Sequence, residues 1–269
     1  MDEHRSGRTG ARGIGRPGFP RRRRVVVTMC RVVVSQSMYF PWVGMLEQIR
    51  LADVVIHFDD VQFIRNSFFN RSQVKIPGGT AWMTVPLSGY HRGQTIDQVR
   101  IQPVEDWGKR HSGLLGESVR ATPFADDALG MLEAVLAGAH DSLSGLARAS
   151  MMALSRYFGL DADTRFLDSR DFGVGGSASE RLLALVKAVG GTDYITGHGA
   201  RNYLDHGLFE ANGVTVSYMD YRRLPYPQPH GAFTPHVTGL DLVANCGRAG
   251  RANIVSETRN WKEFLNGPA

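Results

Sequence analysis

The sequence is poor in cysteine and lacks the signatures of several common enzyme classes. Its two cysteines, Cys30 and Cys246, lie far apart, which excludes a disulfide framework and a zinc site built on paired cysteines. This cysteine usage favours a reducing compartment, and we predict a cytoplasmic protein. No P-loop or Gly-x-Ser-x-Gly motif occurs, and the histidines show no metal-ligand spacing. The glycine-rich stretch "GVGGSAS", residues 173–179, precedes a predicted helix but matches no dinucleotide fingerprint, so it is predicted to be a turn. We therefore predict neither a metal site nor a tightly bound cofactor.

Long apolar runs are also missing. No stretch approaches the roughly 20 residues that a membrane-spanning helix needs, so we expect a soluble chain with no membrane partner. The positive charge is concentrated at one end. Residues 1–28 hold eight arginines and two acidic residues and so carry +6, which leaves −1 on residues 29–269 for the total of +5.

A segment rich in Arg, Gly and Pro cannot bury enough apolar surface to fold, so residues 1–28 are expected to be a disordered leader. A nucleic-acid-binding arm or a targeting signal are alternatives. The favoured interpretation is that translation starts at Met29, or that the leader has no function. Nucleic acid is therefore not an expected partner.

Residues 29–269 alternate between strand and helix patterns. This alternation favours an α/β fold, a single domain with a mixed, mainly parallel sheet flanked by helices. A helix capped by Thr238 and ended by Gly247 closes the recognisable pattern. Strands are predicted at 31–37, 54–58, 72–76, 82–88, 96–101, 164–169, from 193, and at 214–221, with a turn at 77–79. Helices are predicted at 41–51, 129–139, 143–160, 177–191, 200–213 and 238–247.

Three polar loops follow predicted strands and are expected to meet at one edge of the sheet, where α/β proteins bind ligands. They are "SQSMYFPW", "DDVQF" and "TGHGARNY". The second loop, "DDVQF", lies within the longer segment "FDDVQFIRNSFFNR", residues 58–71. In this segment charged and amide side chains alternate with aromatic ones.

Within this segment, Asp59 and Asp60 are adjacent and should face opposite sides of a strand. A partly buried one could act as a general base, although turn carboxylates that cap a backbone N–H or pair with an arginine, here Arg65 or Arg71, are common. Arg71, with Asn70 beside it, offers a planar fork for a carboxylate or phosphate, and ordinary surface charge is the alternative.

Two further residues are candidates for chemistry. His111, near a tryptophan and two cations in "WGKRH", could be a general base, although a surface histidine on a helix is the commoner case. Cys246 could be a nucleophile if His236 or Asp241 approached it, although a lone cysteine in an apolar helix is usually a small buried hydrophobe.

The order of these polar segments resembles the WbqC-like family across most of residues 32–247. Seven segments carry the resemblance: "VVVSQSMYFPWVGMLEQIRLAD", "DDVQFIRNSFFNR", "WMTVPL", "WGKRH", "SERLL", "YITGHGARNYLD" and "YPQPHGAFTPHVTGLDLVANCG". The sequence departs from the family pattern at four positions. Ser37 replaces a proline, Phe68 replaces a tryptophan, and Thr196 and Thr238 replace serines.

The resemblance implies an α/β protein in which the matched residues form one site. The substrate-binding residues that it implies are Gln36, Tyr39, Trp42, Gln62, Asn70, Arg71, Tyr203, Gln228, Asp241 and Asn245. The catalytic candidates are Asp59, Asp60, His111 and Cys246, with His111 or Asp60 as the proton acceptor.

The family is associated with surface-polysaccharide genes and with suggested glycyl or other acyl transfer onto amino sugars, and related members look like amide-forming enzymes of natural-product pathways. The resemblance therefore implies an amide-forming acyl or aminoacyl transferase. Its donor would be a thioester of coenzyme A or of carrier-protein phosphopantetheine, and its acceptor a small amine. A nucleotidyl- or adenylyl-transfer enzyme and a non-catalytic binder of a carrier-bound or saccharide ligand are the alternatives.

Overall fold

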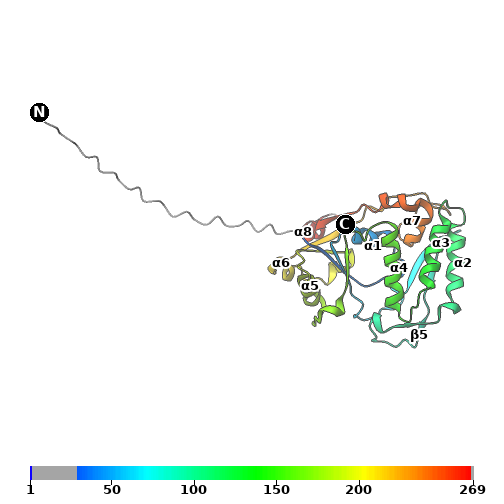
Figure 1. Ribbon diagram of the computed structural model, residues 1–269, viewed down its shortest axis with the longest axis horizontal. Helices are drawn as coiled ribbons and strands as arrows, with labels where there is room; N and C mark the ends of the chain where they lie inside the picture. The colour runs from blue at the N-terminus through cyan, green and yellow to red at the C-terminus, as the bar shows by residue number, and fades with distance from the viewer. Residues whose placement is uncertain (2–28, 268–269) are drawn as a thin grey trace.

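A six-stranded sheet organises the chain in the computed structural model, which describes Met1 and residues 29–267 (Figure 1). The predicted leader, residues 1–28, lies outside the described residues except for Met1. Adjacent strands are parallel, apart from the antiparallel pair of β10 with β9, so the predicted mixed, mainly parallel sheet is confirmed. Across the sheet the order is β10 (Glu257–Asn260), β9 (Thr215–Asp220), β8 (Asp193–Thr196), β1 (Arg31–Ser35), β2 (Val54–His57) and β7 (Arg165–Asp168).

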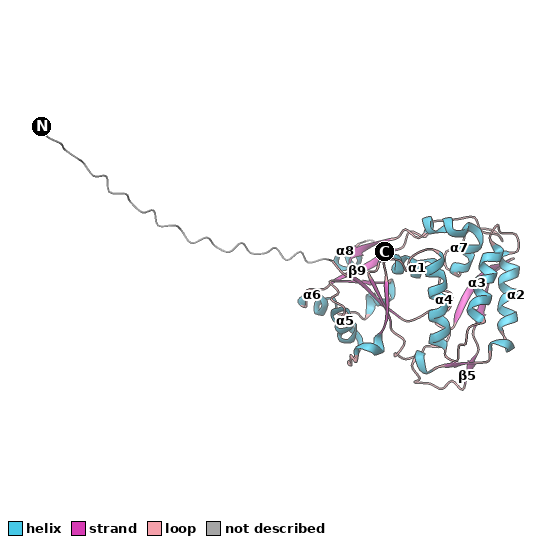
Figure 2. Cartoon of the chain, viewed as in Figure 1, coloured by secondary structure: helices cyan, strands magenta, loops and turns pink. Residues whose placement is uncertain are grey.

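The central strands are apolar on both sides because helices cover both faces of the sheet. Val32 and Val34 of β1 belong to the cluster on one face, and Val33 belongs to the cluster on the other. The first face is covered by α5 (Ala178–Ala188), α6 (His206–Ala211) and α8 (Trp261–Asn266), and the second by α1 (Val43–Leu51) and the helices beyond it (Figure 2). The predicted helices flanking the sheet are therefore present.

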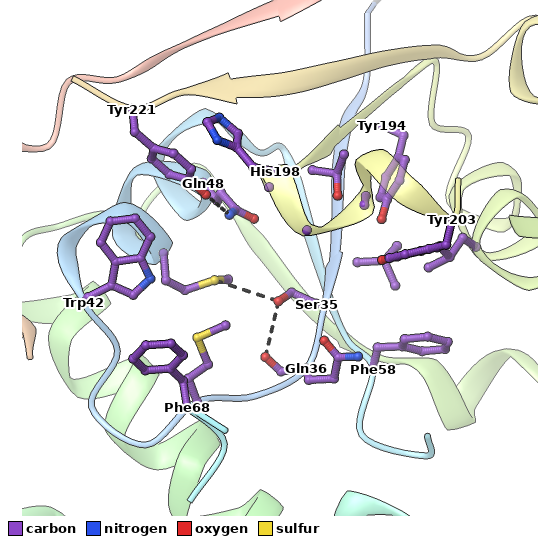
Figure 3. A pocket seen from close by; sticks show the side chains of 18 of the residues that line it. Ser35, Gln36, Trp42, Gln48, Phe58, Phe68, Tyr194, His198, Tyr203 and Tyr221 are labelled. Carbon is purple, nitrogen blue, oxygen red and sulfur yellow. Dashed lines mark hydrogen bonds between the residues drawn. The ribbon is translucent and has the colours of Figure 1, made fainter. Parts of the chain in front are cut away.

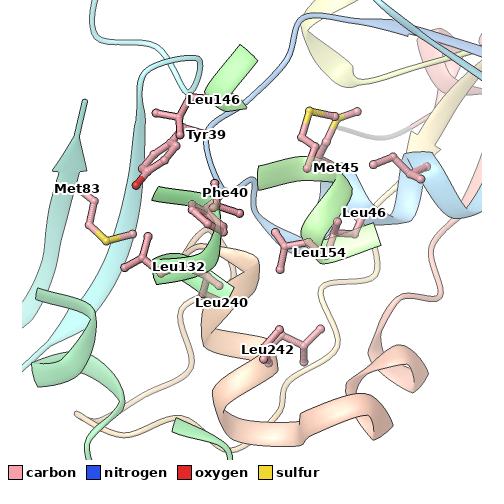
Figure 4. Close-up of a cluster of buried hydrophobic side chains, with 14 of the residues drawn as sticks. Tyr39, Phe40, Met45, Leu46, Met83, Leu132, Leu146, Leu154, Leu240 and Leu242 are labelled. Carbon is pink, nitrogen blue, oxygen red and sulfur yellow. The ribbon is translucent and has the colours of Figure 1, made fainter. Parts of the chain in front are cut away.

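The second face continues into a helical layer. Leu132, Leu146, Leu154 and Leu240 pack together there with Phe40 (Figure 4). This apolar cluster joins the sheet to the helices in one continuous core. The helices are α2 (Gly108–Val119), α3 (Ala125–Leu136), α4 (Leu143–Tyr157) and α7 (Gly239–Cys246). Two small antiparallel pairs lie with them: β3 (Arg71–Ile76) with β4 (Gly79–Thr84), and β5 (Leu87–Ser88) with β6 (Arg100–Ile101).

Local sequence signals predicted several boundaries correctly. The Thr238 hydroxyl accepts a hydrogen bond from the Leu240 amide at the start of α7, and Gly247 ends that helix with φ of 56°. The turn between β3 and β4 contains Gly78 with φ of 83°, a conformation that favours glycine.

Three predictions of secondary structure were wrong, and two elements were missed. The predicted strand 82–88 is interrupted, because β4 ends at Thr84 and Leu87–Ser88 form the separate strand β5. Residues 96–101 begin with a 3₁₀ turn, Ile96–Gln98, because Thr95 and Gln98 form a capping box, and only β6 remains of the strand. Residues 200–213 contain two short helices rather than one, since Asp205 caps α6 after the 3₁₀ turn His198–Asn202 has ended. The polar strand β10 and helix α8 were not predicted.

The strand order defines where a ligand is expected. Numbered along the chain, the six strands run 3-2-1-4-5-6 across the sheet, and the order reverses between β1 and β8. Parallel sheets of this order bind ligands in the crevice outside the carboxyl ends of the strands at that switch point. Among the described residues, no helix is both long enough and apolar enough to span a membrane.

Candidate active site

A cavity of about 730 Å³ opens at the switch point between β1 and β8 (Figure 3). Ser35 and Gln36 reach it from the end of β1, Phe58 follows β2, and Thr196 and His198 come from the end of β8. Two of the three predicted strand-end loops, "SQSMYFPW" and "TGHGARNY", thus line the cavity, whereas "DDVQF" follows Phe58 and lies outside the lining. Helix α1 and the chain between β9 and α7 contribute further lining residues, and Phe68 and the first turns of α5 complete the walls. These residues are Trp42, Met45, Gln48, Phe68, Ala178, Leu182, Tyr221, Arg223 and His236.

Four rings form one wall of this switch-point cavity. The ring of Trp42 lies 5.0 Å from that of Tyr221 and 5.0 Å from that of His236, centroid to centroid. The ring of His198 lies 5.1 Å from that of Tyr221. Such contacts between tilted rings are favourable and fix the relative positions of the polar edges.

Tyr221 is a fixed hydrogen-bond donor in this wall. Gln48 Nε2 donates to the Tyr221 hydroxyl oxygen at 2.8 Å. Burial raises the pKa of Tyr221 to about 12, so the phenol is protonated at neutral pH. No described residue accepts its hydrogen, which leaves the O–H free to donate to a ligand.

The two imidazoles are suited to accept a proton. His198 Nε2 donates to the Met219 carbonyl at 2.7 Å, so that Nδ1 carries the free lone pair. His236 packs against the Trp42 ring, and burial, with Arg223 nearby, lowers its pKa below the usual histidine value. His236 is therefore neutral at pH 7.

The charge in the switch-point cavity has one sign. Arg223 contributes a guanidinium, and of the described residues that line the cavity none carries a carboxylate. An ammonium group would find no partner there, whereas a neutral amine or an anionic group would. No three His, Cys, Asp or Glu side chains are grouped as metal ligands in the described part of the chain.

Three of the predicted substrate-binding residues line this cavity: Gln36, Trp42 and Tyr203. Gln36 and Trp42 lie on the segment between β1 and α1, and Tyr203 follows the 3₁₀ turn after β8. The other predicted residues lie outside its lining. Most of them belong to three separate groups, and Gln62, Asn70 and Arg71 lie on β3 and the loop before it.

The first group is a network of buried charges under the end of β2. Asp59 is fully buried and accepts a hydrogen bond of 2.6 Å from Arg148 Nε on α4. Arg148 also bonds Asp168 at the end of β7. Burial alone would raise the pKa of Asp168, but bonds from Arg170 and Arg148 hold it well below the usual range. Arg170 in turn pairs with Asp97.

Asp60 faces the opposite side of the sheet, as its alternation with Asp59 predicted. Its carboxylate pairs with Arg181 on α5 and accepts a hydrogen bond of 2.6 Å from the Ser169 hydroxyl. Both acidic residues thus bond arginines, which differ from the Arg65 and Arg71 considered from the sequence.

Ser37 contacts both His57 and Asp59 without forming a catalytic triad with them. The Ser37 hydroxyl is 2.8 Å from Asp59 Oδ2 and 2.9 Å from His57 Nδ1. A carboxylate can only accept, so the hydroxyl donates to Asp59 and accepts from His57. Its proton therefore points to the acid, and the fully buried Ser37 has no access to a substrate.

The second group surrounds His111, which is buried in the helical layer. His111 Nε2 donates to the Thr84 carbonyl at 3.2 Å, and its Nδ1 accepts from the Tyr39 hydroxyl at 3.0 Å. Burial lowers the pKa of His111 to about 4. Both ring nitrogens are thus occupied, and neither Tyr39 nor His111 lines the switch-point cavity.

Asn70 and Arg71 lie at the start of β3. Asn70 is buried and donates from Nδ2 to the Val85 carbonyl at 3.3 Å. Arg71 bonds the Asn66 carbonyl and stacks over Trp82, with 4.0 Å from its guanidinium carbon to the ring centroid. The side chain of Gln62 is exposed on the preceding loop.

The third group secures the chain between β9 and α7. The fully buried Asp241 accepts from Gln228 Nε2 at 2.7 Å and from the Tyr226 hydroxyl at 2.8 Å. Asn245 donates to the Asp241 carbonyl at 2.8 Å. Cys246, at the end of α7, is half-buried, and burial raises its pKa, so its thiol is protonated at neutral pH.

Five polar residues of the cavity were not predicted to line it: Gln48, His198, Tyr221, Arg223 and His236. His236 was considered only as a possible partner of Cys246. A signal existed for His198, which lies in a loop directly after a strand end. Gln48 and His236 lie on helix α1 and on an irregular segment, and nothing in their local pattern indicates that they face a cavity.

The fold and the cavity define an α/β protein with its candidate site at the switch point of a parallel sheet. The profile of the WbqC-like protein family matches residues 36–253. A relative in Mycobacterium tuberculosis (strain ATCC 25618 / H37Rv), "Uncharacterized protein Rv1507c", is 32% identical over 223 residues, which are 81% of this chain and 95% of the relative. The chain therefore belongs to the WbqC-like family, as the resemblance predicted. No solved structure matches it.

Gly44 allows the Trp42 ring to lie in the cavity wall. A Cβ atom added at Gly44 would come within 2.2 to 2.5 Å of three atoms of that ring. We predict that Gly44→Ala displaces the Trp42 indole and weakens ligand binding about tenfold, although alanine is the better helix former by about 1 kcal/mol. Tryptophan fluorescence and ligand titration would test this. Gly116→Ala in α2, where the nearest atom is 4.0 Å from the added Cβ, is the matched control.

Proposed function

We propose that the protein is an amide-forming acyl or aminoacyl transferase. It would join an amine of a sugar or amino acid to an acyl group supplied as a thioester, in surface-polysaccharide or natural-product biosynthesis. One observation supports this most strongly. The switch-point cavity combines a protonated phenol, Tyr221, with an imidazole lone pair, His198 Nδ1, and has no carboxylate among its described lining residues.

The chemistry requires a base for the amine and a donor for the oxyanion. The amine nitrogen attacks the thioester carbonyl carbon, and the Tyr221 hydroxyl donates to the oxygen on which negative charge develops. His198 Nδ1 takes the proton from the attacking nitrogen. The carbon–sulfur bond then breaks, the proton passes to the thiolate, and the products are an amide and a thiol.

The surroundings of these two groups suit neutral substrates. The amine must be unprotonated to attack, and a cavity with Arg223 and no carboxylate does not stabilise its ammonium form. Gln36 and the aromatic side chains of Trp42 and Tyr203 can hold the acyl group and the acceptor through amide hydrogen bonds and apolar contact.

The test is mass spectrometry of products. The full chain is offered glycyl and acetyl thioesters of coenzyme A and of N-acetylcysteamine, together with a panel of amino sugars and amino acids. A new amide mass is expected. We expect Tyr221→Phe, which keeps the ring contact with Trp42, to lower kcat by about 10²–10³. His198→Ala should lower kcat by about 10²–10⁴.

Controls separate this proposal from the roles predicted from the sequence. His111→Gln changes a histidine outside the cavity and should leave kcat within about threefold of the wild type if the protein remains folded. No amide with any donor, or full activity of both His198→Ala and Tyr221→Phe, would reject the proposal.

The strand order favours a second candidate, a nucleotidyl- or adenylyl-transfer enzyme. Sheets of the order 3-2-1-4-5-6 often bind nucleotides at the switch point, although this chain has no glycine-rich turn after β1. Thermal stabilisation by ATP or a nucleotide sugar, lost in Arg223→Ala, together with no amide product, would support this candidate.

A further inference from the structure

Exposed apolar side chains gather on the segments that form the walls of the switch-point cavity. Phe68 and Tyr203 line the cavity and are 41% and 59% exposed (Figure 3). Ile64 lies four residues before Phe68 and is 65% exposed. Leu224 follows Arg223, which also lines the cavity, and is 39% exposed. Apolar side chains that gather at the mouth of a cavity, rather than singly over the surface, are typical of interaction sites.

The three segments that carry these exposed apolar side chains are strongly basic. Residues 61–71, 198–204 and 221–236 together hold five arginines, no lysine, and no aspartate or glutamate. Because residues 29–269 carry −1 in total, the part outside these segments carries −6. These three segments, which contribute Phe68, Tyr203 and Arg223 to the cavity lining, thus carry +5.

None of these five arginines pairs with a carboxylate within the described part of the chain. Arg65 lies over the ring of Tyr90, with its guanidinium carbon 5.1 Å from the centroid, and Arg201 lies 5.8 Å from the centroid of Phe264. The described ion pairs involve other arginines and Lys262. We call Arg65, Arg71, Arg201, Arg222 and Arg223 the arginine rim. Arg71 donates to the Asn66 carbonyl and lies over Trp82, but no carboxylate of the described residues neutralises it or the other four.

We propose that the arginine rim is the docking surface for an acidic carrier protein, which inserts its thioester-bearing arm into the switch-point cavity. This inference rests on the proposed function, because it names the partner that delivers the acyl donor. Arginine with exposed Phe, Tyr, Ile and Leu side chains suits a protein surface that presents carboxylates beside apolar residues. A simple polyanion would use the charges but not the apolar side chains.

The experiment compares a rim variant with a matched control in the full chain. Arg65→Glu/Arg222→Glu reverses two rim charges that do not line the switch-point cavity. Arg110→Glu/Arg120→Glu makes the same change in charge on exposed residues of α2 and its C-cap. The probe is a bacterial acyl carrier protein whose phosphopantetheine bears glycine, and heparin serves as the polyanion.

Binding to the carrier is measured by calorimetry at low and at physiological salt. The wild type and the control should bind the carrier, more weakly at the higher salt, and the rim variant should bind at least about tenfold more weakly than either. Equal losses in the two variants, no binding of the carrier to the wild type, or binding of heparin alone would overturn the docking surface.

Activity with two donors separates failure of the docking surface from failure of the proposed function. In the rim variant, kcat/KM should fall at least about tenfold for the carrier-bound donor and stay unchanged for the glycyl thioester of N-acetylcysteamine. If the rim variant uses both donors as well as the wild type does, the docking surface is wrong and the transferase stands. If the wild type makes no amide from either donor, the proposed function is wrong, whatever the carrier binds.

Discussion

Replacing Asp59 by alanine should lower the free energy of unfolding by about 3–5 kcal/mol, the cost of removing one partner from a buried ion pair. The carboxylate is fully buried and holds Arg148 Nε at 2.6 Å. Without it, the guanidinium would keep only its bond to Asp168 while still largely shielded from water. Urea unfolding would measure the loss as a lower midpoint concentration with an unchanged m value.

The control for this prediction is an exposed ion pair at another strand end. Asp220, the last residue of β9, pairs with Arg259, and both side chains are about 40% exposed. Asp220→Ala should cost about 0–1 kcal/mol, as exposed pairs usually do. If Asp59→Ala were no more costly than Asp220→Ala, Arg148 would have another partner and the network would not be a structural support of β2.

The same carboxylate positions the cavity wall. Asp59 accepts hydrogen bonds of 2.8 Å from both the backbone N–H and the hydroxyl of Ser37. The neighbours of that residue, Gln36 and Met38, line the cavity. Loss of Asp59 should therefore weaken ligand binding through the loop after β1, even though Asp59 itself is outside the cavity lining.

The sequence predicted the sheet well because apolar strands that are buried on both faces have a strong local pattern. The runs "VVV" and "VVI" are such strands, and alternation along a strand correctly predicted that Asp59 and Asp60 face opposite sides. The carboxyl ends of the strands then placed the polar loops at one edge, where the cavity lies.

The pairing of side chains could not be predicted in the same way, because it depends on contacts between distant segments. Asp59 and Arg148 are 89 residues apart, and Asp60 and Arg181 are 121 residues apart. His111 looked like a base because its local sequence is polar, but its ring is enclosed by Tyr39 and Thr84, which come from other parts of the chain. The cavity residues Gln48 and Tyr221 are likewise 173 residues apart and meet only in the fold.

We call the chain between β9 and α7, residues 221–238, the strap. We predict that its position depends on one buried ammonium group, that of Lys75. Lys75 on β3 is 2% exposed, and its Nζ donates to the carbonyls of Gly231 at 2.9 Å and Ala232 at 2.6 Å and to Gln228 Oε1 at 3.3 Å. Gln228 Nε2 in turn donates a hydrogen bond to the buried Asp241 carboxylate. Lys75 thus makes three bonds to the middle of this irregular segment, which His230 also ties to the Ser118 carbonyl of α2 at 3.1 Å.

Replacing Lys75 by methionine keeps the volume of the side chain and removes all three of these bonds. Because bonds from a charged donor are worth about 1.5–3 kcal/mol each and the freed acceptors stay buried, we expect a loss of about 3 kcal/mol in the free energy of unfolding. The strap also carries Tyr221, Arg223 and His236 into the cavity, so ligand binding should weaken as well. The exposed Lys187, with one bond of 3.1 Å to Asn212, provides the matched change Lys187→Met, which should have little effect on either quantity. A Lys75→Met protein of wild-type stability and wild-type ligand affinity would show that Asp241 and Gln228 hold the strap without the lysine.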